Sequence, residues 1–129
     1  MARIRSKNTK PEVLTRSAVQ ALGLRFRNHV DDLPGKPDLA NKTRKWAIFV
    51  HGCFWHRHSG CIRTTTPKRN RLFWEDKFAQ NQRRDTRVRT ALHKLGFTTI
   101  VVWECQVENN ESLVIRRFTR RLRPPAGQS

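Results

Sequence analysis

The feature that most constrains this chain is the stretch IFVHGCFWHRHSGC, which runs from Ile48 to Cys61. An apolar run ends there in a segment that holds three histidines, two cysteines and an adjacent Phe-Trp pair within fourteen residues. The pattern predicts a buried strand that enters a loop. Because loops seldom carry so many potential metal ligands, the segment is a candidate structural metal site, a catalytic centre, or both.

The cysteines and one histidine have the spacing of a metal site. Cys53, His58 and Cys61 follow the pattern C-x4-H-x2-C, which lets one loop supply three ligands to a tetrahedral ion. Cys105, at the end of the predicted strand TTIVVWEC, is the candidate fourth ligand, and such a ligand set favours Zn²⁺. The alternative is a buried strand cysteine and a surface histidine. An odd number of cysteines, three, argues against a disulfide framework.

Two histidines and one aspartate remain as candidates for catalysis. His51 and His56 are not needed by zinc, and free imidazoles are candidate general bases and phosphate binders. Asp38 follows a proline at a strand end, where a carboxylate can hold Mg²⁺ against a phosphate. The alternatives are two exposed or hydrogen-bonded histidines and an ordinary turn aspartate.

The aromatic pair Phe54 and Trp55 lies between Cys53 and His56. Large aromatic side chains on a metal-held loop can belong to the hydrophobic core. They can also insert between base pairs, as apolar side chains do in proteins that kink DNA. The residues alone leave both interpretations open, with the core favoured.

The charge of the chain indicates nucleic acid as its partner. There are 27 Lys and Arg against 10 Asp and Glu, a formal net charge of +17. A field of this sign attracts phosphate backbones, and binding releases counterions. The sequence has neither a secretory signal, a membrane span nor a basic amphipathic membrane helix, so we expect a cytoplasmic, nucleoid-associated protein without a membrane partner.

The pattern of apolar residues predicts one α/β domain over residues 1–123, with a flexible tail at 124–129. Thr9 and Glu12 form a T-x-x-E capping box at the start of the first helix. Helices are expected at 9–23, at 112–122 and, as a pair, within 68–95, and strands at 24–30, 98–105 and as a hairpin within 33–50.

Five stretches together resemble the very-short-patch repair (Vsr) endonuclease family: RSKNTKPE, LPGKPDL, FVHGCFWHRHSGC, FWEDKFAQNQRRD and LGFTTIVVWEC. They occur in order over the chain to about residue 105. The resemblance implies a divergent restriction-endonuclease-like (PD-(D/E)xK-related) mixed sheet flanked by helices, with a structural zinc site. It implies an Mg²⁺-dependent DNA endonuclease that nicks duplex DNA 5′ to the thymine of a T:G mismatch, as in repair of deaminated 5-methylcytosine.

The resemblance also implies a role for each matching residue. Asp38 and the carbonyl of Val50 would bind Mg²⁺, because Val50-His51-Gly52 stands where the fold usually has its D/E-x-K signature. His56, oriented by Asp85, would be the general base, and His51 would contact the phosphate and support the leaving group. Cys53, His58, Cys61 and Cys105 would bind zinc, and Phe54 and Trp55 would intercalate at the mismatch. Glu12 and Asn81 would lie near the metal-bound waters. A short N-terminal arm would make further DNA contacts through Met1, Arg3, Arg5 and Lys7.

Two other functions stay open beside this one. The first is a Vsr-like nuclease of a restriction or defence system with broader mismatch specificity or none. The second is a zinc-stapled DNA-binding module whose catalytic site has decayed, although the presence of Asp38, His51, His56 and Asp85 together argues against it. For the repair enzyme we expect a monomer whose partner is double-stranded DNA with a T:G mismatch, with mismatch-repair proteins as further candidate partners.

Overall fold

A four-stranded sheet lies at the centre of the computed structural model, which describes residues 9–122. The strands are β1 (Arg27–Asn28), β2 (Leu39–Asn41), β3 (Trp46–His51) and β4 (Thr98–Trp103), and they lie in the order β1-β2-β3-β4. β1, β2 and β3 pair antiparallel, whereas β3 and β4 pair in parallel along their whole length. The expected α/β class with a mixed sheet is therefore confirmed.

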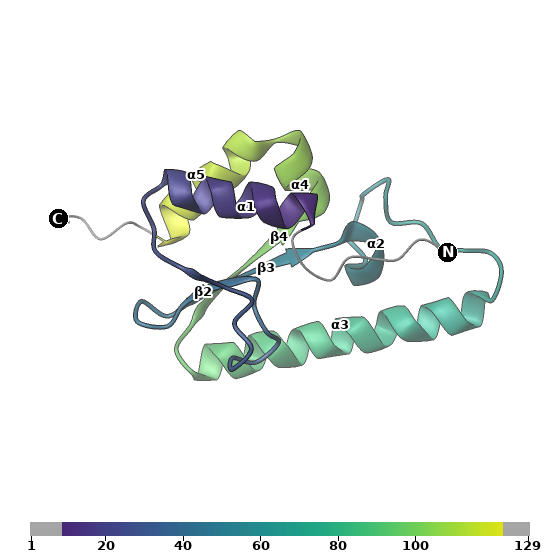
Figure 1. Cartoon of the computed structure of the whole chain (residues 1–129). Helices are drawn as coiled ribbons and strands as arrows, with labels where there is room; N and C mark the ends of the chain where they lie inside the picture. Colours follow the sequence, from purple (N-terminus) through teal and green to yellow (C-terminus); the bar gives the residue numbers. More distant parts are fainter. Residues whose placement is uncertain (1–8, 123–129) are drawn as a thin grey trace.

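The helices form two layers, one on each face of the sheet (Figure 1). Parallel strands require a crossover, and the chain passes from β3 to β4 through α2 (Cys53–His56) and α3 (Arg71–Lys94). α3 lies along one face, and α1 (Lys10–Ala21), α4 (Glu104–Asn109) and α5 (Glu111–Leu122) lie on the other. Within residues 9–122, every helix is too short or too polar to cross a lipid bilayer.

The core is divided by the sheet, because successive side chains of a strand point to opposite faces. In β3, Trp46 and Ile48 pack into the cluster under α1, α4 and α5, which also contains Phe118 of α5. Ala47 and Phe49 pack on the other side, against Leu92 of α3. Both faces of β3 are covered, which explains why its sequence WAIFV is apolar throughout instead of alternating.

The prediction of two helices within residues 68–95 is wrong, because one helix of 24 residues, α3, occupies this segment. The sequence of α3 contains neither glycine nor proline, so nothing in the backbone interrupts it. Gly96 follows its end with a left-handed φ of 85°, the conformation that a glycine after a helix commonly adopts. The continuous helix extends from the segment beside α2 to the start of β4, so one rigid element spans the molecule (Figure 1).

Four smaller expectations also need correction. The strand expected at 98–105 ends at Trp103, so Cys105 lies in the first turn of α4. The strand expected at 24–30 is reduced to two residues, β1, and the loop expected after β3 begins with the helical turn α2. Thr9 is the N-cap residue of α1, but its side chain makes no capping bond, and Glu12 contacts His29 instead.

The expected DNA contacts of Met1, Arg3, Arg5 and Lys7 lie outside the described residues, as does the expected tail at 124–129.

Candidate active site and metal centre

The candidate catalytic carboxylate Asp38 lies beside the end of β3. Leu39 of β2 pairs with Ile48 of β3, so the antiparallel pairing places the start of β2 next to the last residues of β3. The backbone N–H of Val50 donates a hydrogen bond of 2.7 Å to Asp38 Oδ2. This bond occupies one carboxylate oxygen and leaves Oδ1 for another partner.

A cavity of about 290 Å³ opens at this edge of the sheet. A side chain at Gly35 would place its Cβ 2.4 Å from Val88 Cγ1, so glycine allows the segment before β2 to approach α3 this closely. The cavity is lined by residues of α1, β3, α2, α3 and the segment before β2, among them Glu12, Lys36, Asp38, Val50, His51, His56, Arg84, Asp85 and Arg89. The structure therefore brings the four expected catalytic side chains, Asp38, His51, His56 and Asp85, to one cavity.

The two histidines of the cavity are stacked on each other. Their ring centroids are 3.8 Å apart and their planes differ by 8°. His56 Nδ1 lies 2.7 Å from Asp85 Oδ2, so α3 supplies a carboxylate that orients the ring carried by α2. A hydrogen bond at Nδ1 leaves Nε2 of His56 able to accept a proton, which is the arrangement of a histidine general base.

Burial changes the protonation of two groups at the cavity. Burial raises the pKa of Asp38 to about 6; the bond from Val50 opposes this change and the nearby Glu12 adds to it. Burial and then the neighbouring His56 lower the pKa of His51 to about 4. At neutral pH, His51 is therefore uncharged, and Asp38 is a carboxylate in a place that disfavours its negative charge.

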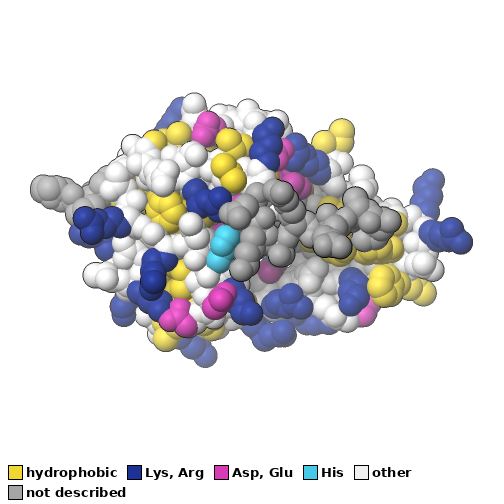
Figure 2. Space-filling view, viewed as in Figure 1, with side chains coloured by type: hydrophobic (Ala, Val, Ile, Leu, Met, Phe, Trp, Pro, Cys, Tyr) yellow, Lys and Arg dark blue, Asp and Glu magenta, His cyan; other side chains and the backbone are white. Residues whose placement is uncertain are grey.

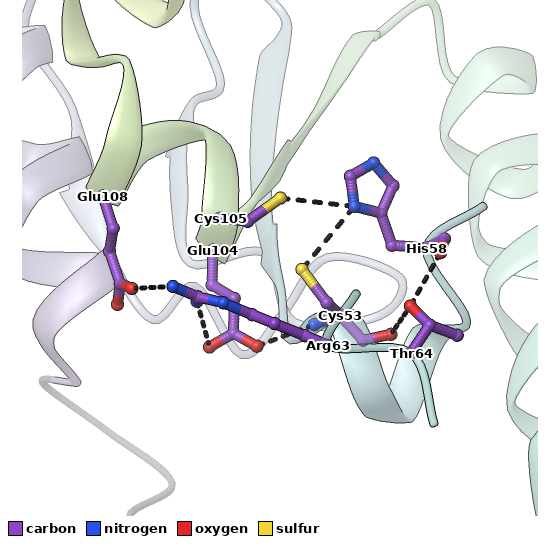
Figure 3. Close-up of polar contacts among 7 residues, drawn as sticks. All are labelled: Cys53, His58, Arg63, Thr64, Glu104, Cys105 and Glu108. Carbon is purple, nitrogen blue, oxygen red and sulfur yellow. Dashed lines mark hydrogen bonds and ion pairs between the residues drawn. The ribbon is translucent and has the colours of Figure 1, made fainter. Parts of the chain in front are cut away.

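The three cysteines and His58 form a second cluster, of which Figure 3 shows Cys53, Cys105 and His58. One ligand atom of each residue lies within 4.8 Å of the other three. His58 Nδ1 is 3.6 Å from Cys53 Sγ and 3.4 Å from Cys105 Sγ. Burial raises the pKa of the Cys53 thiol to about 12, so a cation would be needed to hold it as a thiolate. Three thiols and one imidazole around a common centre are a tetrahedral metal-ligand set.

Polar contacts join this cluster to α4 (Figure 3). The N–H of Cys53 donates to Glu104 Oε1 at 2.9 Å. Arg63 bridges to Glu104 at 3.7 Å and to Glu108 at 2.9 Å, and the hydroxyl of Thr64 donates to the carbonyl of His58 at 2.7 Å. The segment after α2 is therefore attached to α4 by ion pairs as well as by the candidate metal ligands.

Trp103, the last residue of β4, connects the two clusters. Its ring stacks on His58, with centroids 4.3 Å apart, and meets His51 edge-on at 5.3 Å. Sequence reasoning did not select this tryptophan, although it precedes Glu104-Cys105 in the stretch WEC. One aromatic side chain thus contacts both a candidate metal ligand and a candidate catalytic histidine.

Phe54 and Trp55 belong to an aromatic cluster on α2 and the start of α3. Phe54 meets Phe78 at 5.1 Å, and Trp55 meets Trp74 at 5.6 Å between ring centroids. Phe78 is buried, whereas Phe54, Trp55 and Trp74 are only half-buried. Phe54 and Trp55 are therefore partly exposed to solvent on one side and pack against Phe78 and Trp74 on the other.

Arg57 and Asn81 fix this cluster in place. The guanidinium of Arg57 lies 3.8 Å from the centre of the Phe78 ring and donates to the carbonyls of Phe54 and Thr65. The amide of Asn81 donates to the carbonyl of Trp55 at 3.3 Å, so it joins α3 to α2. Asn81 thus lies at this junction, while Glu12, the other expected supporting residue, lines the cavity.

Basic side chains cover much of the visible surface, including the lower edge along which α3 runs (Figure 2). The exposed arginines of this helix include Arg83, Arg84, Arg87 and Arg89, and two of them also line the cavity. A helix that carries positive charge to a cavity with candidate catalytic groups can hold a phosphate backbone across that cavity.

Comparison with known proteins supports a nuclease family for the whole arrangement. The family model described as DNA mismatch endonuclease Vsr matches residues 1–63. The chain is 43% identical over 116 residues to the type II nicking enzyme V.XorIIP of Xanthomonas oryzae pv. oryzae, covering 90% of this chain and 85% of that protein. It is 36% identical over 122 residues to the DNA mismatch endonuclease Vsr of Escherichia coli K12, covering 95% of this chain and 78% of that protein.

The chain belongs to the Vsr family of DNA mismatch endonucleases.

Membership of the Vsr family makes the chain a DNA endonuclease and its partner DNA. A further relative is the type II nicking enzyme V.NmeAIP of Neisseria meningitidis, 42% identical over 123 residues, or 95% of this chain and 86% of that protein. The expectation of an endonuclease is thereby confirmed.

The sequence did not reveal His29, which follows β1 and lies close to the cavity residues Glu12 and Asp38. The only signal for it was a histidine in a short predicted strand.

Proposed function

We propose that this Vsr-family endonuclease nicks one strand of duplex DNA 5′ to the thymine of a T:G mismatch, and that it requires Mg²⁺. The observation that carries the proposal is the convergence of Asp38, His51 and the His56–Asp85 pair on one cavity beside the exposed edge of Phe54 and Trp55. Hydrolysis would leave a 5′-phosphate on the thymine and a 3′-hydroxyl on the preceding nucleotide.

Asp38 and the carbonyl of Val50 would hold the cation. Oxygen donors suit Mg²⁺, and a carboxylate whose pKa burial has raised to about 6 gains most from a nearby positive charge. When bound, Mg²⁺ supplies neutralisation of the charge that builds on the phosphate. The Val50–Asp38 hydrogen bond keeps the two candidate donors next to each other.

The histidines would move the protons. His56 takes a proton from the attacking water at Nε2, while Asp85 holds Nδ1 and stabilises the imidazolium that forms. The water oxygen bonds to phosphorus as the bond from phosphorus to the 3′ oxygen breaks, and that oxygen leaves and takes a proton from solvent water to become the 3′-hydroxyl. His51 is neutral and packed against Trp103, so it contacts the phosphate as a fixed hydrogen-bonding group near the leaving oxygen.

Phe54 and Trp55 would insert beside the mismatch, where unstacking costs least. Their support is the base formed by Phe78 and Trp74, together with Arg57. Zn²⁺ held by Cys53, His58, Cys61 and Cys105 would attach this segment to α4, consistent with a donor set that suits that ion. In this proposal the sheet and its flanking helices have the restriction-endonuclease-like arrangement.

A second candidate is a nicking enzyme of a restriction system with broader mismatch specificity or none. It is favoured by the names of two relatives with 43% and 42% identity, both type II nicking enzymes. The two candidates share the catalytic residues, so substrate preference alone separates them.

A strand-resolved nicking assay tests the proposal. End-labelled duplexes with one T:G mismatch and matched T:A and C:G controls are incubated with Mg²⁺ and without it. A single Mg²⁺-dependent nick 5′ to the mispaired thymine is expected, and Asp38→Ala should abolish it while DNA binding remains. Equal cleavage of matched duplexes would support the restriction-associated enzyme instead, and an active Asp38→Ala variant would overturn the metal assignment.

A further inference from the structure

Glu12, His29 and Asp38 form a compact group of metal-ligand side chains at the cavity. One ligand atom of each lies within 4.8 Å of the other two. They come from α1, from the residue after β1 and from the residue before β2, so only the folded chain brings them together. Glu12 and Asp38 line the cavity, and Asp38 is the carboxylate proposed above to bind the cation.

The backbone directs His29 toward the carboxylates. Its N–H donates to the carbonyl of Asp38 at 2.9 Å, and its Nε2 lies 3.2 Å from Glu12 Oε1. His29 has a left-handed φ of 47°, a conformation that is unfavourable for a residue other than glycine. Its side chain is 22% exposed, so the ring is held between protein groups and not free in solvent.

The spacing of the three side chains suits a shared cation. Glu12 is only 6% exposed and lines the same cavity as Asp38, so two carboxylates lie close together in a poorly solvated place. Two ligands of one small divalent ion lie about 3 Å apart when adjacent and about 4 Å apart when opposite. The three ligand atoms here lie within 4.8 Å of one another, and His29 Nε2 is 3.2 Å from Glu12 Oε1. A nitrogen donor and two carboxylates can therefore bind one ion after small side-chain adjustments.

We propose that His29 is a nitrogen ligand in the cation site of Glu12 and Asp38, and that it shifts the preference of this site from Mg²⁺ toward Mn²⁺. The inference rests on the proposed role of Asp38 and adds two ligands, Glu12 and His29, and a cation preference to it. Mg²⁺ binds oxygen ligands and retains its waters, whereas imidazole binds first-row transition ions well. Removing the imidazole should thus weaken Mn²⁺ binding more than Mg²⁺ binding.

Direct binding measurements test this inference. Mn²⁺ is titrated into the protein with its cysteine cluster loaded with zinc, free Mn²⁺ is followed by electron paramagnetic resonance, and Mg²⁺ affinity is obtained by competition. His29→Asn tolerates the left-handed backbone, and His29→Gln is a second variant with a longer side chain. His93→Gln changes an exposed histidine near the end of α3 and is the matched control.

We expect His29→Asn and His29→Gln to weaken Mn²⁺ binding about tenfold or more, as loss of groups at a metal site commonly does, and Mg²⁺ binding by less than about threefold. The ratio of nicking rates in Mn²⁺ and Mg²⁺ should fall in parallel, and His93→Gln should change nothing. If folded variants lose affinity for both ions equally, or for neither, His29 is only a partner of Glu12 and the inference is overturned.

Asp38→Ala, measured beside these variants, separates this inference from the proposed function. If Asp38→Ala loses cation binding and nicking while both His29 variants behave as wild type, only the role of His29 fails. If Asp38→Ala still binds Mn²⁺ and nicks DNA, the proposed cation site itself fails.

Discussion

Replacing Asp38 by asparagine should stabilise the protein while it destroys activity. Burial raises the pKa of this carboxyl from 3.8 to about 6, which means that the folded state disfavours its negative charge. Asparagine has the same shape, and its carbonyl oxygen can accept the hydrogen bond that Asp38 accepts from the N–H of Val50. The substitution therefore removes the charge and leaves the contact.

The magnitude follows from the shift in pKa. The rise of about 2 pKa units corresponds to about 3 kcal/mol of destabilisation by the ionised Asp38 at pH 8. A raised carboxyl pKa means that the folded protein holds the proton more tightly than the unfolded chain. The penalty therefore shrinks as pH falls through 6, to about half its value at pH 5, and vanishes below 3.8.

The assay is urea unfolding followed by tryptophan fluorescence at pH 8, 7, 6 and 5, with the cysteine cluster loaded and Mg²⁺ omitted. Asp38→Asn should be more stable than wild type at pH 8, by up to about 3 kcal/mol, and the difference should fall by about half at pH 5. Asp76→Asn, an exposed carboxylate of α3, is the control and should show little change.

Adding Mg²⁺ should cancel most of this difference. At about one hundred times its dissociation constant, a ligand that binds only the folded state contributes about 2.7 kcal/mol. Wild type should gain this stability and Asp38→Asn should not. A variant that is less stable than wild type at pH 8 without Mg²⁺, or a difference that does not change with pH, would refute the argument from burial.

Three further predictions address the rest of the site. At limiting Mg²⁺, nicking should decline as pH falls below about 6, since protons compete for Asp38, and rising Mg²⁺ should move the decline to lower pH; a pH–rate series at two Mg²⁺ concentrations measures it. Cys105→Ser should reduce the zinc content below one equivalent and lower unfolding stability by about 3 kcal/mol or more, as shown by elemental analysis and thermal melting; retention of both would contradict the metal centre. Trp55→Ala should weaken binding to a T:G duplex by about 1–3 kcal/mol with a smaller loss on matched DNA, whereas Leu113→Ala on α5 should leave both unchanged in a binding titration.

Features that depend on near neighbours could be predicted from the sequence. The β-branched run before Trp103 forms a strand, the apolar face of residues 112–122 packs Val114 and Phe118 inward, and Gly23 and Gly96 follow the ends of their helices. The spacing of Cys53, His58 and Cys61 likewise brings three candidate ligands together within one segment. Each of these depends on local geometry that a few residues specify.

The boundaries inside long polar or mixed segments could not be predicted in this way. The break expected within residues 68–95 does not exist, because packing of Phe78, Val88 and Leu92 holds α3 as one helix despite its polar composition. Glu12 was assigned to a capping box because T-x-x-E is a local pattern. A partner from another segment, His29, contacts its carboxylate instead.

By itself, the sequence determined the fold class, the basic character and the chemical types of the site residues, because these depend on composition and short-range spacing. Only the tertiary structure decided which residues meet. The antiparallel pairing of β2 with β3 sets Asp38 against Val50, the crossover through α3 brings Asp85 to His56, and the start of α4 carries Cys105 to His58. These contacts join residues far apart in the chain, and they exist because burying both faces of one sheet leaves few ways to place the helices that cover it.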